Sequence, residues 1–126
     1  GGAMVAIEAS EAEVLADSPR LDIAAINGPH SVVVSGDEPE AVAYAEQWRA
    51  RGRRVKRLSV GHAFHSARME PMLADFKHTL AGATFTEPTL TLISNVTGRP
   101  APPTEICTPD YWVTHVRSTV RFADGI

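Results

Sequence analysis

Four short runs of aliphatic and β-branched residues divide the first 60 positions of the chain. Runs of this length and composition predict β-strands, and they lie at 4–8, 21–26, 31–35 and 55–60. The turn Asn27-Gly28-Pro29 separates the second and third runs. Glycine and proline at such a position are typical of a tight connection between neighbouring strands. The pattern therefore predicts two strands joined directly at this turn.

The polar stretches between these runs have the features of two helices. Ser10 is a capping residue type followed by Glu11 and Glu13, which predicts a short helix to about position 16. A second helix is expected between Asp37, as its cap, and Gly52, at its end. Its apolar face is predicted from the three-residue step of Val42, Ala45 and Trp48. The resulting β-α-β-β-α-β order is that of a ferredoxin-like unit, in the α/β (α+β) class.

The second half of the chain has fewer strand signals. Ser66 is expected to cap a helix over 67–80. The apolar side of this helix would consist of Met69, Met72, Leu73, Phe76 and Leu80. A short strand is predicted at 90–94, a helix over 109–116 after a Pro-rich loop, and another helix from Arg121.

The composition is that of one ordinary globular domain. Of the 126 residues, 44% are hydrophobic and 21% are charged, which is enough apolar surface for a core. The formal charge of −3 argues against nucleic acid as a partner. No segment has the character of a secretory signal or a membrane span, and the single Cys107 excludes an internal disulfide. These features predict a reducing, cytoplasmic setting with no membrane contact.

One short stretch is strongly basic. It contains Arg49, Arg51, Arg53, Arg54, Lys56 and Arg57. Two interpretations stay open: a solvated helix end and strand edge, or a docking patch for an acidic partner such as a carrier protein.

Few residues have the spacing that catalysis or metal binding requires. The chain contains no G-x-G-x-x-G, Walker or G-x-S-x-G motif. His62, His65 and His78 could bind zinc, but no cysteine or suitably spaced carboxylate completes such a site, and no metal is predicted. The segment 60–66 places two histidines and Phe64 where a predicted strand ends and a helix begins. Reactive groups in α/β folds are often found at such junctions.

Five blocks in order along the chain resemble the acyltransferase domains of modular type I polyketide synthases. The most specific block is His62-Ala63-Phe64-His65-Ser66 followed by Met69-Glu70-Pro71-Met72-Leu73. The others are Ala25-Ile26-Asn27-Gly28-Pro29 with Val32-Val33-Val34-Ser35-Gly36, Leu92-Ile93-Ser94-Asn95-Val96-Thr97-Gly98, Tyr111-Trp112-Val113 with His115-Val116-Arg117, and Val120-Arg121-Phe122. Together they cover nearly all of the chain, and the resemblance is to the malonyl-CoA-selective type.

The resemblance implies an architecture in two parts. Relatives have an α/β-hydrolase-like large subdomain with an inserted ferredoxin-like small subdomain. Residues 1–58 would form most of the small subdomain, and residues 59–126 the C-terminal part of the large one. The β-α-β-β-α-β order obtained from the sequence pattern agrees with this division.

The resemblance also implies a mechanism. In this family a serine takes the acyl group from malonyl-CoA and passes it to the phosphopantetheine thiol of an acyl carrier protein. His65 matches the general base, and Asn27 matches a residue near the site. Backbone carbonyls orient the ring of this histidine in the family, one of them from the residue matching His115. No permanently bound cofactor is implied. The implied partners are the acyl carrier protein, the upstream remainder of the domain and the flanking synthase domains.

His62, Ala63 and Phe64 match the positions linked to substrate selectivity in this family. Methylmalonyl-type relatives tend to have the motif Tyr-Ala-Ser-His at the positions where this chain has His62-Ala63-Phe64-His65. Phe64 would narrow the pocket where a serine leaves room for a methyl branch. One methyl group in a pocket is worth about 1–3 kcal/mol, so the preference for malonyl is expected to be real but leaky.

Several parts of the family's catalytic site have no counterpart in the chain. The nucleophilic serine, the arginine that binds the malonate carboxylate and the oxyanion donors lie upstream in relatives. The chain is therefore expected to be a C-terminal fragment, cut at both ends and inactive alone. Ala67 replaces a common proline, and Arg117 is expected to be a structural or surface charge. A non-catalytic ferredoxin-like module for carrier-protein or subunit binding is the main alternative.

Overall fold

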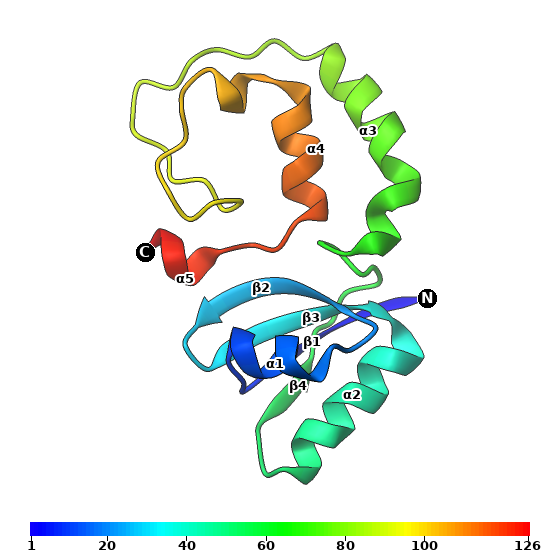
Figure 1. Cartoon of the computed structure of the whole chain (residues 1–126). Coiled ribbons are helices and arrows are strands. Elements are labelled where there is room, and N and C mark those ends of the chain that lie inside the picture. Colours follow the sequence, from blue (N-terminus) through cyan, green and yellow to red (C-terminus); the bar gives the residue numbers. More distant parts are fainter.

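The computed structural model describes all 126 residues, and Figure 1 shows them as two parts, one above the other. The lower part in this view contains a β-sheet with helices α1 (Glu11–Asp17) and α2 (Glu38–Ala50). The upper part contains helices and a long irregular segment. None of the helices has the length and apolar character needed to cross a membrane.

The sheet has four antiparallel strands in the order β2-β3-β1-β4. They are β1 (Gly2–Ile7), β2 (Asp22–Gly28), β3 (Ser31–Asp37) and β4 (Val55–Arg57). With α1 after β1 and α2 after β3, the element order is β-α-β-β-α-β. The predicted mixed α/β class is confirmed. Pro29 and His30 form the connection between β2 and β3, whereas Asn27 and Gly28 of the predicted turn belong to β2.

Alternate residues along the strands face the two sides of the sheet, as the two-residue period of a strand requires. Val5, Val32 and Val34 pack with Tyr44 and Trp48 of α2 in the larger core cluster. On the opposite face, a smaller cluster is formed by Met4, Ala24 and Val33, with Leu58 and Val60 partly buried against it. This second face turns toward the upper part in Figure 1.

Two expectations about α2 were correct only in part, because Ala45 and Trp48 are buried as expected but the cap and Val42 differ. Asp37 lies at the N-cap position, but its side chain makes no capping hydrogen bond and instead pairs with Arg68. Val42 is 40% exposed. The buried face consists of Ala41, Tyr44, Ala45 and Trp48. This is an i, i+3, i+4, i+7 pattern, which keeps all four side chains on one side of a helix with 3.6 residues per turn.

The upper part begins with the 3₁₀-helix η1 (Ala67–Met69) and continues as α3 (Glu70–Ala81). Ser66 caps η1 as expected, through a hydrogen bond from the N–H of Arg68. Pro71 occupies the first turn of α3, where its missing N–H leaves no bond unmade. The remaining elements are η2 (Glu105–Cys107), α4 (Pro109–Arg117) and α5 (Phe122–Gly125).

The strand predicted at 90–94 is absent. Only an isolated bridge joins Ile93 to Pro100, and Leu90 is 81% exposed. The aliphatic residues in this segment have no neighbouring strand to complete a ladder, so strand propensity alone does not produce a sheet. The predicted strand at 55–60 also ends early, at Arg57.

Backbone hydrogen bonds join the two parts along β2. The N–H of Val120 donates to Ala24 O at 2.8 Å, and the N–H of Ile26 donates to Val120 O at 2.9 Å. The segment that follows α4 thereby runs parallel to β2 at Ala25. The end of α4 is consequently held at a defined position over the sheet.

Candidate active site

His65 lies in the loop formed by residues 61–66, here called the histidine loop, between β4 and η1. Its backbone has a φ of +54°, in the left-handed region that few residues with a side chain adopt. Such conformations persist only where surrounding contacts hold them, and they are concentrated at functional sites. The N–H of His65 donates to Val116 O at 3.2 Å, which is one such contact.

The imidazole of His65 is held by two main-chain carbonyls. Nδ1 lies 2.9 Å from Ser118 O and 3.1 Å from His115 O. Both partners can only accept hydrogen bonds, so Nδ1 must carry a proton. In the neutral ring Nε2 is then the unprotonated nitrogen, with a lone pair that can accept a proton.

These carbonyls belong to the end of α4, where the last carbonyls of a helix lack intrahelical partners. His65 supplies a backbone N–H and a ring N–H to that end. The ring is therefore oriented by main-chain acceptors, without a carboxylate.

The side chain of His115 packs beside that of His65. The two ring centroids are 5.9 Å apart with an edge-on geometry, and the rings of Tyr111 and Trp112 lie 6.2 and 5.7 Å from that of His115. Burial, with a smaller effect from His65, lowers the pKa of His115. The lowered pKa favours the neutral form of His115, which adds no positive charge beside His65.

The other residues of the histidine loop have different environments. Ala63 is 1% exposed and packs against Gly2 at the start of β1. Ser66 is buried, and its hydroxyl donates to Ala63 O at 2.6 Å. Phe64 is 39% exposed, with its ring 5.7 Å from that of His62. The structure thus places Ala63 as a packing contact and leaves Phe64 and His62 facing outward.

Asn27 is exposed near the end of β2. The start of this strand, at Asp22, contacts the end of the histidine loop through a hydrogen bond from Ala67 N–H. Asn27 lies five residue steps along the strand from Asp22, a rise of about 17 Å at 3.3 Å per residue. Among the described hydrogen bonds, none joins Asn27 to His65.

Sequence reasoning did not identify the carbonyl of Ser118, the closer partner of Nδ1. Arg117 was expected to be a structural or surface charge, and it pairs with Glu70 and Asp22. The predicted end of a helix near position 116 was a usable signal, because carbonyls at a helix end require partners.

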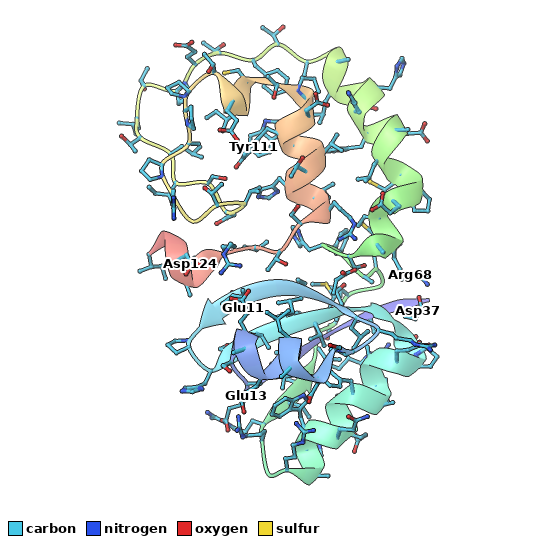
Figure 2. The ribbon with its side chains drawn as sticks, in the orientation of Figure 1. Glu11, Glu13, Asp37, Arg68, Tyr111 and Asp124 are labelled. Carbon is cyan, nitrogen blue, oxygen red and sulfur yellow. The ribbon has the colours of Figure 1, made fainter.

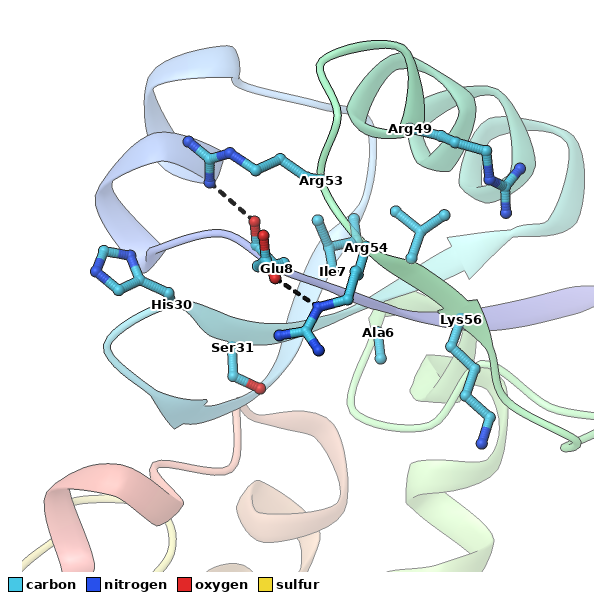
Figure 3. Close-up of a pocket in the computed structure, with 10 residues that line it drawn as sticks. Ala6, Ile7, Glu8, His30, Ser31, Arg49, Arg53, Arg54 and Lys56 are labelled. Carbon is cyan, nitrogen blue, oxygen red and sulfur yellow. Dashed lines mark hydrogen bonds and ion pairs between the residues drawn. The ribbon is translucent and has the colours of Figure 1, made fainter.

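The basic stretch forms part of a groove of about 590 Å³ at the edge of the sheet (Figure 3). Arg53 donates to Glu8 O at 2.9 Å and pairs with Glu13, and Arg54 pairs with Glu8 at 2.7 Å. The arginines of the groove are thus largely neutralised within the chain, which favours a structural role for this stretch. The structure brings together no group of three histidine, cysteine or acidic side chains that could hold a metal ion.

The site is thus a histidine held by two main-chain carbonyls, on a loop beside an antiparallel sheet. A sequence profile of the family described as "Acyl transferase domain" matches residues 1–126. The chain therefore belongs to this family, and it matches the acyltransferase domains of modular polyketide synthases.

Individual relatives agree with this assignment. The chain is 48% identical over 130 residues to "Polyketide synthase GfsA" of Streptomyces halstedii, covering 100% of this chain and 2% of that protein. The acyltransferase domain from the second module of the salinomycin polyketide synthase superposes with a TM-score of 0.90 at 46% identity, over 99% of this chain and 30% of that one. Malonyl CoA-acyl carrier protein transacylase from Burkholderia pseudomallei superposes with a TM-score of 0.85 at 28% identity, over 98% and 44%. The chain thus spans less than half of each relative.

Proposed function

We propose that this chain is part of a polyketide synthase acyltransferase that transfers a malonyl unit from CoA to the phosphopantetheine thiol of an acyl carrier protein. The observation that carries the proposal is the donation of the His65 Nδ1 proton to two main-chain carbonyls. This arrangement leaves Nε2 as the proton acceptor that activation of a serine hydroxyl requires. The similarity to a malonyl CoA-acyl carrier protein transacylase supports the choice of substrate.

The proposed reaction has two half-reactions in which His65 moves one proton each way. Nε2 accepts the serine proton as the serine oxygen attacks the malonyl thioester, and it returns the proton to the departing CoA sulfur. Nε2 then takes the proton of the phosphopantetheine thiol, whose sulfur attacks the acyl-serine, and returns it to the serine oxygen. The carbonyls of His115 and Ser118 would keep the ring in one tautomer throughout.

The proposal assigns the two parts of the chain to two subdomains. Residues 1–58 would form a ferredoxin-like small subdomain, and the β2-β3-β1-β4 strand order with both helices packed in one core supports this name. Residues 59–126 would belong to the α/β-hydrolase-like large subdomain. We also propose that the serine, the carboxylate-binding arginine and the oxyanion donors come from the rest of the domain, so that residues 1–126 do not turn over alone.

Selectivity for malonyl is proposed to depend on Phe64. Its outward position in the histidine loop, one residue from His65, supports a role at the edge of the acyl pocket. Ala63, buried against Gly2, would act by holding the loop, and His62 by contact with the Phe64 ring. Asn27 would act only if a substrate or another segment of the domain reaches the end of β2. The proposed setting is the cytoplasm, with the acyl carrier protein and flanking synthase domains as partners.

Replacement of His65 tests the proposed function. In the complete acyltransferase domain, His65→Ala should lower malonyl transfer by about 10²–10⁴-fold, the usual contribution of general acid–base catalysis. The matched control is His78→Ala, which removes an exposed histidine from α3 and should leave transfer unchanged. Transfer is measured by mass spectrometry of the acylated carrier protein. Full activity of the His65→Ala domain would disprove the proposal.

A further inference from the structure

Arg117 lies in the segment that holds His65. The three carbonyls that bind His65 belong to His115, Val116 and Ser118, on both sides of Arg117. We propose that Arg117 is a positioning residue for His65: its side chain joins the carbonyl-bearing end of α4 to the segment that carries the histidine. This inference rests on the proposed function, because it assigns a role to Arg117 in the same proton transfer.

The contacts of Arg117 reach both segments that surround the histidine. Nε donates to Glu70 Oε1 at 2.7 Å, and Glu70 begins α3 five residues after His65. Nη1 lies 3.8 Å from Asp22 Oδ2 at the start of β2. The same Asp22 oxygen accepts a hydrogen bond from Ala67 N–H at 2.7 Å, two residues after His65. Arg117 and its two acidic partners thus connect α4, α3 and β2 around the histidine loop.

The geometry of His65 requires that the end of α4 and the histidine loop keep a fixed relative position. The left-handed backbone of His65 persists only if its surroundings hold it. Two carbonyls converge on a single Nδ1 proton, so a shift of the end of α4 relative to the loop weakens both bonds together. An ion pair between α4 and the start of α3 opposes that shift.

The Arg117–Glu70 ion pair is expected to affect the reaction rate more than the folding stability. The side chain of Arg117 is 30% exposed and that of Glu70 is 58% exposed, so the pair adds little to folding stability. A displacement of about 1 Å at a catalytic group can nevertheless cost about 10²-fold in rate. A positioning residue should therefore affect kcat far more than the melting temperature.

The test uses the complete acyltransferase domain and the variants Arg117→Ala and Arg117→Lys. Arg117→Ala should lower kcat for malonyl transfer by about 10–10²-fold with KM unchanged, and Arg117→Lys should recover part of the loss by keeping a charge beside Glu70. The matched control is Arg53→Ala, which removes an arginine of similar exposure that pairs with Glu13 of α1 and makes no contact with the end of α4 or with α3. The NMR signal of the His65 Nδ1 proton should broaden in Arg117→Ala and remain in Arg53→Ala.

The Arg117 and His65 variants distinguish a failure of the positioning role from a failure of the proposed function. If Arg117→Ala has an unchanged kcat and an intact Nδ1 signal while His65→Ala lowers transfer as predicted, the positioning role is overturned. Full transfer by His65→Ala would instead overturn the proposed function. If Arg117→Ala does not fold, Glu70→Gln replaces it, because this variant removes the partner charge at an exposed position. Glu70→Gln should lower kcat in the same direction, and an unchanged kcat would overturn the inference.

Discussion

Phe64 is a large apolar side chain of the histidine loop that remains accessible, whereas its neighbour Ala63 is buried. An aromatic ring there would occupy the space that an α-methyl branch of the acyl group requires. Phe64→Ser should therefore raise the ratio of methylmalonyl to malonyl transfer by about 10-fold or more, since one methyl group is worth about 1–3 kcal/mol in a pocket. Competition between the two CoA thioesters, read by mass spectrometry of the carrier protein, measures the ratio.

The control for this steric effect is Phe122→Ser. Phe122 is 50% exposed at the start of α5, outside the histidine loop. It should leave the ratio unchanged. An unchanged ratio in Phe64→Ser itself would contradict the role of the ring.

Helix α1 shows how one element is stabilised by its cap and by a distant arginine. Ser10 Oγ accepts the N–H of Glu13, and Glu13 Oε1 accepts the N–H of Ser10, which forms a capping box. Arg53 pairs with the same carboxylate at 2.9 Å, and Glu13 is labelled in Figure 2. The hydrogen bond from Arg53, followed by that from Ser10, lowers the pKa of Glu13 to about 2.

The lowered pKa of Glu13 predicts acid sensitivity. The unfolded chain binds a proton at Glu13 near pH 4.5, whereas the folded chain binds it only near pH 2. Stability is therefore fully present above about pH 4.5 and is lost as the pH falls toward 2. Glu13→Gln should be less stable than the natural protein at pH 7, and the difference should shrink at pH 3. Urea unfolding at both pH values measures it, and a difference independent of pH would contradict the assignment.

At the scale of the whole molecule, the sheet and the histidine loop are in close contact between Gly2 and Ala63. A Cβ on Gly2 would lie 2.7 Å from the Ala63 Cβ and 2.8 Å from the Ala63 nitrogen. Nearby, Arg68 pairs with Asp37 at the end of β3, and both are labelled in Figure 2. The loop that carries His65 is thus packed directly on β1 and tied to β3.

Gly2→Ala should push the histidine loop away from the sheet. We expect a loss of stability of about 1–3 kcal/mol, as for other overpacked contacts, together with reduced malonyl transfer. Gly61→Ala is the matched control within the same loop, because no atom lies within 4 Å of its added Cβ. Thermal unfolding and transfer assays of both variants check this. Equal stability and equal malonyl transfer in the two variants would show that the contact between Gly2 and Ala63 does not hold the loop.

The sequence predicted features that depend on residues close together in the chain better than features that depend on distant residues. The cap of α1 at Ser10 and the hairpin after Asn27 depend on residues within a few positions of each other, and both are present. The predicted strand at 90–94 needed a partner that the fold does not supply. Val42 was assigned to the wrong face because a three-residue step does not specify which neighbouring positions meet the sheet. The resemblance drew attention to His65, but not to the carbonyl of Ser118.

The sequence by itself determined the order of helices and strands in the first half and the family to which the chain belongs, because both depend on local patterns and ordered motifs. Only the tertiary structure decided how His65 is held, since its partners at His115 and Ser118 are 50 and 53 residues away. The tautomer follows from those contacts, because two acceptors converge on one nitrogen. Such convergence arises when α4 ends beside the histidine loop, and no spacing along the chain encodes it.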